Sequence, residues 1–500
     1  MTTFCIALAI LVLGYLIYGK FVEKVFGIEP ERKTPCYTQA DGVDYMPMPT
    51  WKVFLIQFLN IAGTGPIFGA ILGILYGPAA YLWIVLGCVF GGAVHDFLAG
   101  MISLRKGGMS LPEIIGDELG MGARMGIRCL SLILMVLVGT VFAQTPATLL
   151  GNMTSDWAVW GSWNAVSAWT AIVFAYYILA TLLPIDKLIG RIYPLFGLAL
   201  LVMAFGVLGG IFTKSGNLPE ITEAFSNHHP NPYAMSIFPG ICITIACGAV
   251  SGFHATQSPM MARCMKNERL GRGIFYGAMI AEGIVALIWA AAAIKFADSL
   301  NVDGSTPYEK LMNAITDPVS GKTNPAIIVN QICHNWLGTV GALLAILGVV
   351  AAPLTSGDTA LRCARLIAAD FMKVKQDKIA KRLMLCLPIF AISIALMFID
   401  FNIIWRYFAW TNQTLSVFTL WTISVWLAKR GKFFWVSLVP AFFMTIVCTS
   451  YILMAPEGFN GPQLPSVTTG IVLAAGCTGI FLQKARKWKK ELGSTAKSTK

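Results

Sequence analysis

The stretch Asn60-Ile61-Ala62-Gly63-Thr64-Gly65-Pro66-Ile67-Phe68-Gly69 lies in the middle of an apolar run from Trp51 to about Tyr76. A run of that length can cross a bilayer, which takes roughly 20 apolar residues. Its centre holds glycine and proline, which favour leaving a helix. An unwound turn leaves backbone groups unpaired, so a membrane tolerates it only where protein or a solvated cavity receives it. The stretch predicts either a broken helix at a binding site or an ordinary proline kink.

A second apolar run, from about Ser236 to Ala262, is interrupted by Cys247-Gly248-Ala249-Val250-Ser251-Gly252-Phe253-His254-Ala255-Thr256-Gln257-Ser258-Pro259. This stretch is again rich in glycine, and it brings hydroxyl, imidazole and amide side chains to membrane depth. Interrupted helices in corresponding places of two halves indicate the substrate site of a secondary transporter. The two stretches together favour such a site over a simple kink.

The composition indicates the class of protein. The 500-residue chain is 56% hydrophobic and 12% charged, whereas a soluble domain carries about 25% charged residues. We expect an all-α polytopic membrane protein, in contact with membrane lipid and acting on a small-molecule substrate. The formal charge of +12 then reflects lysines and arginines that anchor cytoplasmic loops, not a nucleic-acid site.

Thirteen apolar runs predict about 13 transmembrane helices. In this arrangement 32 of the 37 lysines and arginines fall on one side, which is then the cytoplasm. The N-terminus is expected outside and the C-terminus inside, and the tail after Gln483 is expected to be disordered near anionic lipid. The predicted spans are 2–18, 51–76, 79–103, 127–150, 165–183, 192–212, 236–262, 273–296, 334–360, 383–400, 402–428, 433–454 and 466–483.

The interrupted helices are the second and seventh spans, and each begins a set of five. Asp96 follows Gly65 by 31 residues, and Glu282 follows Ser251 by 31 residues. Because the two sets enter from opposite sides, we predict a five-plus-five inverted repeat. The units are an N-terminal helix and cytoplasmic loop (1–50), the first repeat (51–212), the second repeat (236–428), two C-terminal helices (433–483) and a basic cytoplasmic tail (484–500), with the loop 297–331 as an external cap or gate.

Ionisable side chains inside a bilayer are costly and are therefore candidate functional groups. Glu282 has no basic residue near it in the sequence, so its carboxyl favours the protonated form and suits proton coupling. Asp96 and Asp358 are as well explained by structural ion pairs, for example to an inner-loop arginine. Thr355 and Ser356 offer oxygen ligands for Na⁺, or bond back to their own helix. The candidate coupling-ion residues are Glu282, Asp96, His95, Thr355, Ser356 and Asp358.

An anionic substrate can accept hydrogen bonds from the free N–H groups of the half-helix that begins after Gly65. His254 supplies a further donor or serves packing, and Asn412 and Gln413 need partners at their depth. No cofactor, catalytic residue or metal site is expected besides the coupling ion, H⁺ or Na⁺, because the cysteines lack zinc spacing. The candidate substrate-binding residues are Asn60, Gly63, Thr64, Gly65, Ser251, Gly252, His254, Gln257, Asn412 and Gln413.

Several motifs in combination resemble the carbon starvation protein A family, which belongs to the amino acid–polyamine–organocation superfamily. They are Asn60–Gly69, Leu86–Asp96, Arg105–Gly108, Gly248–His254 and Trp405–Thr414. The resemblance covers nearly all of residues 50–428. It implies a LeuT-type fold, a place in the bacterial inner membrane, and import of peptides or of pyruvate with protons.

The leading hypothesis is a cation-coupled importer of a small carboxylate or of short peptides, with the proton favoured and access alternating. A sodium-coupled amino acid permease is the alternative. An intramembrane serine hydrolase is remote, because Ser251 and His254 are three residues apart whereas members of a triad usually come from separate elements. Pore-loop signatures and a phosphate-binding loop are both absent, which disfavours a channel and ATP drive. Substrate, coupling ion and oligomeric state stay open.

Overall fold

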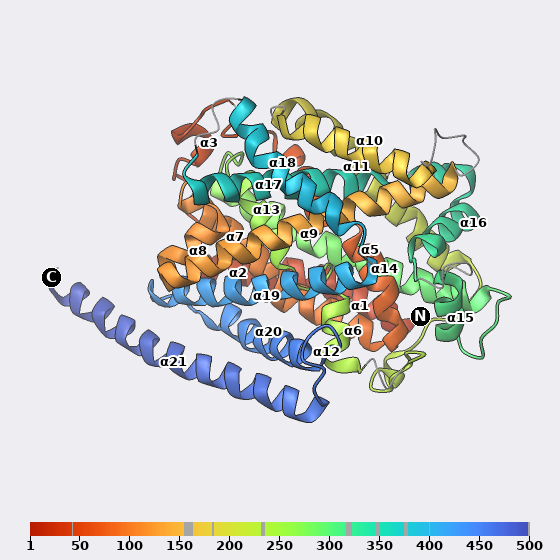
Figure 1. The fold of residues 1–500 in the computed structure, drawn as a ribbon. Helices are drawn as coiled ribbons and strands as arrows, with labels where there is room; N and C mark the ends of the chain where they lie inside the picture. The colour runs from red at the N-terminus through yellow and green to blue at the C-terminus, as the bar shows by residue number, and fades with distance from the viewer. Residues whose placement is uncertain are drawn as a thin grey trace.

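All regular structure in the described part of the chain is helical, apart from an isolated bridge between Thr316 and Thr323. A computed structural model describes residues 1–42, 44–154, 164–182, 185–231, 236–316, 323–345, 348, 350–374, 379–399 and 401–498. The long helices lie side by side in one bundle, and the two termini lie at opposite ends of it (Figure 1).

The first half of the chain covers the residues of the predicted N-terminal helix and of the first predicted repeat. Its elements are α1 (Thr2–Leu13), η1 (Gly14–Tyr18), α2 (Gly19–Phe26), α3 (Pro35–Thr38), α4 (Thr50–Ile61), α5 (Gly65–Gly73), η2 (Ile74–Tyr76), α6 (Ala79–Leu86), η3 (Gly87–Gly92), α7 (Ala93–Arg105), α8 (Leu111–Leu119), α9 (Met121–Met153), α10 (Ala165–Leu182), α11 (Ile185–Thr213) and η4 (Ile221–Glu223).

The second half covers the residues of the second predicted repeat and the C-terminal helices. Its elements are α12 (Ile237–Thr244), α13 (Gly252–Ala262), η5 (Glu268–Leu270), η6 (Arg272–Tyr276), α14 (Gly277–Ser299), α15 (Pro307–Ile315), α16 (Ala326–Ala345), α17 (Ala351–Met372), α18 (Ile379–Leu396), α19 (Phe401–Ala428), α20 (Trp435–Met454) and α21 (Gln463–Ser498).

The helices have the length and composition of membrane spans. Eight in the described ranges are long and apolar enough to cross a bilayer, or nine if α4 and α5 form one bent span. The helices η3–α7 and α14 lie centrally: 78% and 83% of their apolar stretches are buried, against 22% for α21. The chain is thus an all-helical, multi-pass membrane protein, and the total of 13 spans stays a prediction.

Both predicted interruptions are present. The axis bends by 45° between α4 and α5, and residues 245–251 separate α12 from α13. The second break is shorter than predicted, because helix α13 resumes at Gly252 and contains His254 in its first turn. His254 therefore has a fixed place on a helix rather than in the unwound segment.

The helix after each break carries a π-helical segment, η3 before α7 and η6 before α14. Such segments leave backbone carbonyls displaced, and they are frequent at functional sites. Tyr276 of η6 donates its hydroxyl to the Val89 carbonyl of η3 at 2.9 Å. The two irregular segments are thereby joined to each other at the centre of the bundle.

Three predictions about the second half were wrong. The span 334–360 is divided: Gly338 interrupts α16 with φ of 64°, and α17 runs on to Met372. Arg362 and Arg365, expected in an inner loop, are buried on α17. The tail after Gln483, expected to be disordered, continues α21 to Ser498, because most of its residues are lysine, arginine, alanine, glutamate or leucine, which are good helix formers. Part of the predicted outer loop, 317–322, lies outside the described residues.

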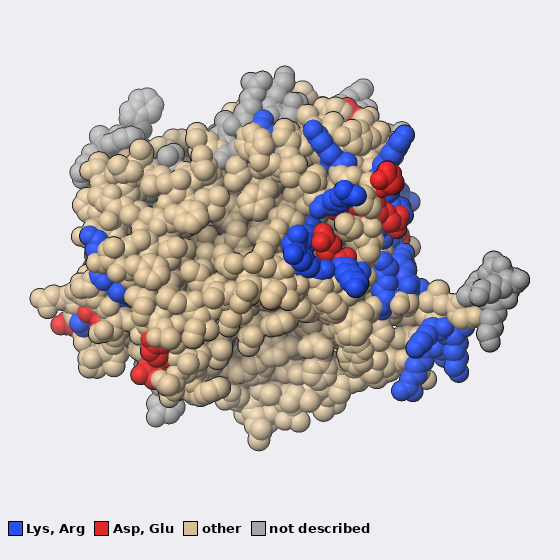
Figure 2. Space-filling view, turned by 180° about the vertical axis from the view of Figure 1, so that it is seen from behind, with Lys and Arg blue, Asp and Glu red and all other residues tan. Residues whose placement is uncertain are grey.

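Charge is distributed unevenly over the surface. Figure 2 shows that lysines and arginines gather at one end of the molecule, where Figure 1 places the C-terminus, and are sparse at the other end. This separation agrees with the lysine and arginine bias of the predicted loops.

One carboxylate organises the lysine- and arginine-rich end. Glu268 is fully buried and binds Arg105 at the end of α7, with Nη2–Oε2 at 2.9 Å, while the Glu29 backbone N–H donates to it at 2.7 Å. The hydrogen bond from Arg32 and the charge of Arg105 lower the pKa of the Glu29 carboxyl. Glu268 therefore holds three segments of the chain together.

Removing this carboxylate is expected to destabilise the fold. Glu268→Ala leaves the Arg105 guanidinium with the half-exposed Glu29 carboxylate, at 3.4 Å, as its remaining ionic partner among the described residues, and breaking a buried pair typically costs about 3–5 kcal/mol. The measurement is the thermal unfolding of the purified protein. Glu29→Ala is the control, because Glu29 is half exposed and exposed pairs contribute about 0–1 kcal/mol. Equal melting temperatures for the two variants would contradict the role of Glu268.

Candidate functional site

The two helix breaks meet at Cys247. A side chain added at Gly65 would place its Cβ 2.5 Å from the Cys247 sulfur. Gly65 is not among the glycines with positive φ. The sequence suggested that this glycine supplies backbone freedom or close approach to a substrate, but the structure gives another reason. The start of α5 lies so close to the second break that no side chain fits between them.

Helix α19 supports both ends of the second break. Asn412 accepts a hydrogen bond from the Phe253 backbone N–H at 2.7 Å, which satisfies an N-terminal donor of α13. Gln413 donates to the Cys242 carbonyl in the last turn of α12 at 2.9 Å. Trp83 donates to the Ile245 carbonyl at 2.9 Å. Asn412 and Gln413 therefore replace backbone bonds that the break removes, and this pairing meets their need for partners at membrane depth.

An acid–histidine cluster lies beside the breaks. His254 Nδ1 is 2.9 Å from Asp96 Oδ2, and His254 Nε2 is 3.4 Å from Glu282 Oε2. The other Asp96 oxygen is 2.7 Å from His95 Nδ1. All four side chains are fully buried. The partners of Asp96 are thus histidines and not the inner-loop arginine considered from the sequence.

This geometry lets one imidazole communicate with two acids. A protonated His254 ring donates from both nitrogens, and so can serve Asp96 and Glu282 at once. His254 Nε2 and Glu282 Oε2, 3.4 Å apart, lack hydrogen-bond geometry, so this contact is longer than the one between His254 and Asp96. Transfer of a proton between Nε2 and the carboxyl needs these atoms to approach to hydrogen-bond distance.

The same region contains three donor atoms that could approach a metal. Atoms of Cys247, His254 and Glu282 lie within 4.8 Å of one another. The spacing in sequence gave no sign of this group. His254 also has a carboxylate beside each ring nitrogen.

Unpartnered polar side chains line the first break. Gln57, Asn60 and Thr64 are fully buried, yet their side-chain oxygen and nitrogen atoms have no hydrogen-bond partner among the described residues. Buried polar groups are paired in the great majority of cases, so these atoms are suited to a polar ligand. Sequence reasoning missed Gln57. Its spacing of three from Asn60, which places both side chains on one face of α4, could have revealed it.

Helix α17 packs against the same break. Ser356 donates to the Leu59 carbonyl at 3.2 Å, and a Cβ at Gly63 would lie 3.0 Å from the Ser356 hydroxyl. Thr355 bonds back to the Ala352 carbonyl at 2.7 Å, as the simpler interpretation expected. Asp358 is buried two residues further along the helix. The candidate coupling residues therefore fall into two groups, one at each break.

The remaining candidate substrate-binding residues pack against neighbouring helices or form hydrogen bonds with them. A Cβ at Gly252 would lie 2.4 Å from the Asn412 carbonyl oxygen, so α13 and α19 are in close contact. Gln257 donates to Thr256 at 3.0 Å and contacts Cys363 of α17, away from the acid–histidine cluster. Ser251 exchanges hydrogen bonds with Asn412 at 3.0–3.2 Å. The nitrogens of His254 face carboxylates instead of Ser251, which is not the arrangement of a serine hydrolase.

Comparisons with known proteins agree with this architecture. The peptide transporter CstA of Bacillus subtilis (strain 168) is 27% identical over 96% of this chain and 96% of its own. The pyruvate/proton symporter BtsT of Escherichia coli (strain K12) is 28% identical over 65% of this chain, a region that spans 53% of that relative. A crystal structure of a mutant Eremococcus coleocola manganese transporter shares the fold, with a TM-score of 0.52 at 13% identity over 90% of this chain and 99% of that one.

The relatives are named as transporters, not enzymes, and they match a chain whose helices have the composition of membrane spans. A family model described as carbon starvation protein CstA matches residues 1–166, 145–324 and 322–451. Because these matches cover all but the last helix, the chain belongs to the carbon starvation protein CstA family.

Proposed function

We propose that this chain is a secondary active importer that couples entry of a small carboxylate or a short peptide to a cation, with H⁺ favoured. The observation that supports this most is the position of His254 between Asp96 and Glu282, beside two helix breaks. The relatives named as a peptide transporter and a pyruvate/proton symporter support the two substrate classes.

The proposed architecture is a five-plus-five inverted repeat of the LeuT type with about 13 spans, in the bacterial inner membrane. The parallel between the halves supports it: each has a broken helix, then a π-helical segment, then an acid 31 residues past the break. Asp96 and Glu282, the corresponding acids, both face His254. The His254 ring is thereby sensitive to the protonation of one acid from each predicted repeat.

In the proposed cycle the substrate binds at the first break and the proton at the second. The unpaired amides and hydroxyl of Gln57, Asn60 and Thr64, with the N-terminus of α5, provide donors for a carboxylate. A proton loaded at Glu282 offsets the charge that the substrate brings. Since α5 touches the second break at Cys247, movement of either broken helix is transmitted to the other, as alternating access requires.

Sodium coupling is the second candidate. Its support is the Leu59 carbonyl beside the Ser356 hydroxyl at 3.2 Å, next to the first break. Backbone carbonyls freed by an unwound helix, together with hydroxyls, are oxygen ligands that suit Na⁺. A sodium-coupled amino acid permease would use this group in place of Glu282.

Substrate exchange tests the proposed function without any gradient. Purified protein in vesicles loaded with unlabelled pyruvate, or with dialanine, is expected to take up the labelled form of the same compound by counterflow. Protein-free vesicles are the control. Counterflow of neither compound would refute the substrate assignment.

The proposed orientation places the lysine- and arginine-rich end in the cytoplasm. Single cysteines at Ser305 and Lys490, both exposed, are introduced after replacement of the exposed Cys5 and Cys129. We expect an impermeant maleimide to label Ser305→Cys in intact cells and Lys490→Cys only after permeabilisation. Labelling of Lys490→Cys from outside would reverse the orientation.

A further inference from the structure

A cavity of about 370 Å³ lies between the two broken helices and α19. It is lined by Phe68 of α5, by Thr244 at the end of α12 and by Ala409 of α19. Its volume falls within the usual range of ligand pockets, about 300–1,000 Å³. It lies at the N-terminal end of α19, and Lys429 and Arg430 follow the other end of that helix.

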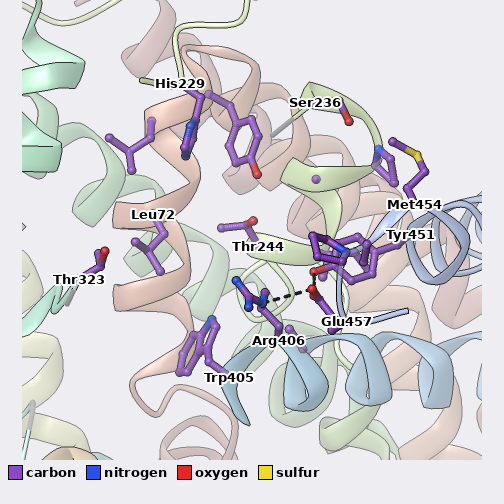
Figure 3. A pocket seen from close by; sticks show the side chains of 18 of the residues that line it. Leu72, His229, Ser236, Thr244, Thr323, Trp405, Arg406, Tyr451, Met454 and Glu457 are labelled. Carbon is purple, nitrogen blue, oxygen red and sulfur yellow. Dashed lines mark hydrogen bonds and ion pairs between the residues drawn. The ribbon is translucent and has the colours of Figure 1, made fainter. Parts of the chain in front are cut away.

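Two opposite charges project into this cavity. Figure 3 shows Arg406 of α19 and Glu457, which follows α20, facing one another. Arg406 Nε is 3.3 Å from Glu457 Oε2, but neither atom has hydrogen-bond geometry with any described residue. The pair is therefore an ion pair without the strong, directional bonding that a guanidinium and a carboxylate can form.

The two members of the pair differ in how firmly they are held. Glu457 is 6% exposed, and its Oε1 accepts a hydrogen bond from Tyr451 at 2.6 Å. Its backbone carbonyl also accepts one from Tyr407 at 3.2 Å. Arg406 is 36% exposed. Because Glu457 lies on the Nε side, the outer edge of the guanidinium retains N–H donors for a ligand.

We propose that this cavity is an outer carboxylate-binding subsite, in which the free edge of Arg406 binds the ligand carboxylate and Glu457 holds Arg406 in place. The subsite is distinct from the buried acid–histidine cluster. Binding a carboxylate through two parallel N–H donors is the geometry for which arginine is suited. The remaining apolar lining, which includes Phe68, Leu72 and Trp405, accepts the body of the ligand.

The subsite is connected to the second helix break. Ala409 lines the cavity, and Gln413 lies one turn further along α19. Gln413 donates to the Cys242 carbonyl in the last turn of α12, whose final residue Thr244 also lines the cavity. A ligand held by Arg406 thus lies against α12, whose last turn leads into the break, and against α19, which is hydrogen-bonded to that turn. This inference rests on the proposed function, since it places the outer subsite on the substrate's path.

A ligand carboxylate has two possible sources: a small keto acid, or the C-terminus of a peptide. Equilibrium binding to the purified protein, with pyruvate, dialanine and dialanine amide as probes, separates them. Pyruvate binding alone assigns the site to keto acids, and dialanine binding without binding of the amide assigns it to peptide C-termini. In either case the proposal predicts that dialanine amide binds weakly to the wild type.

Two variants test the charge pair in opposite directions. Arg406→Gln is expected to weaken carboxylate binding by roughly 10- to 100-fold, the effect of losing hydrogen bonds to a charged group, and not to change binding of dialanine amide. Glu457→Gln retains an acceptor for Tyr451 but removes the competing charge, so carboxylate binding should tighten. Arg269→Gln is the matched control, because Arg269 is exposed in the loop before α14.

Parallel weakening by both variants would show that the pair is structural and would overturn the proposal, as would wild-type carboxylate affinity in Arg406→Gln. A melting temperature near that of the wild type confirms that each variant is folded. Failure of the proposed function looks different: carboxylates would still bind in an Arg406-dependent manner, but no cation gradient would drive their accumulation.

Discussion

Glu282→Gln is expected to abolish proton-driven accumulation of substrate while leaving gradient-free exchange in place. The carboxyl is fully buried, and its only basic neighbour in the described structure within 4 Å is the His254 ring, at 3.4 Å. Glutamine has the shape of a protonated glutamate but cannot release a proton. The variant should therefore still carry bound substrate across the membrane in both directions, but a pH gradient should no longer drive its accumulation.

The measurement compares pH-gradient-driven uptake with counterflow in the same vesicles. We expect driven uptake to fall by about 100-fold or more, as is common when a group that transfers protons is lost, with counterflow within about threefold of the wild type. Glu309→Gln is the matched control, because the Glu309 carboxylate makes exposed hydrogen bonds at the N-terminus of α15, outside the acid–histidine cluster. Undiminished driven uptake by Glu282→Gln would remove this carboxyl from the mechanism.

Gly65→Leu is expected to abolish transport altogether, both driven uptake and counterflow. Even a Cβ at this position would lie 2.5 Å from the Cys247 sulfur, so leucine must push α5 away from the second break. Inserting extra atoms into a packed core typically costs about 1–3 kcal/mol. The displacement also disturbs the two breaks together, and therefore both halves of the proposed site.

The control is Gly476→Leu on α21, where an added Cβ would meet nothing within 4 Å. Counterflow and thermal unfolding are measured for both variants. The melting temperature of Gly65→Leu should fall and that of Gly476→Leu should stay near that of the wild type. Normal counterflow by Gly65→Leu would mean that the first break is a simple kink and that the site lies elsewhere.

Much of the order of the helices could be predicted from the sequence, because the length of an apolar run and the position of a helix-breaking residue are visible in neighbouring residues. The breaks after Ile61 and before Gly252 coincide with Gly63–Pro66 and Ser251–Gly252. The division near Gly338 was missed, because a single glycine within an apolar run is compatible with a continuous helix. The helical extension to Ser498 was missed because a basic, polar tail was taken as a sign of disorder.

The contacts of the site could not be predicted in the same way, because they join residues far apart in the chain. Asp96 and His254 are 158 positions apart, and no local pattern indicates that a histidine on α13 lies between acids from two other helices. The spacing of 31 residues predicted corresponding places for the two acids. It did not reveal that they share one imidazole.

The central claim is that a proton, carried by the Asp96–His254–Glu282 cluster, drives import. Its most direct test is uptake of labelled pyruvate and of dialanine into vesicles containing the purified protein, under two separate conditions. One imposes a pH gradient, acid outside, without Na⁺; the other imposes an inward Na⁺ gradient at equal pH. We predict accumulation of at least one of the two compounds above the outside concentration with the pH gradient alone. Accumulation of either compound with the Na⁺ gradient alone, and none with the pH gradient, would contradict this account and assign coupling to the Ser356 group.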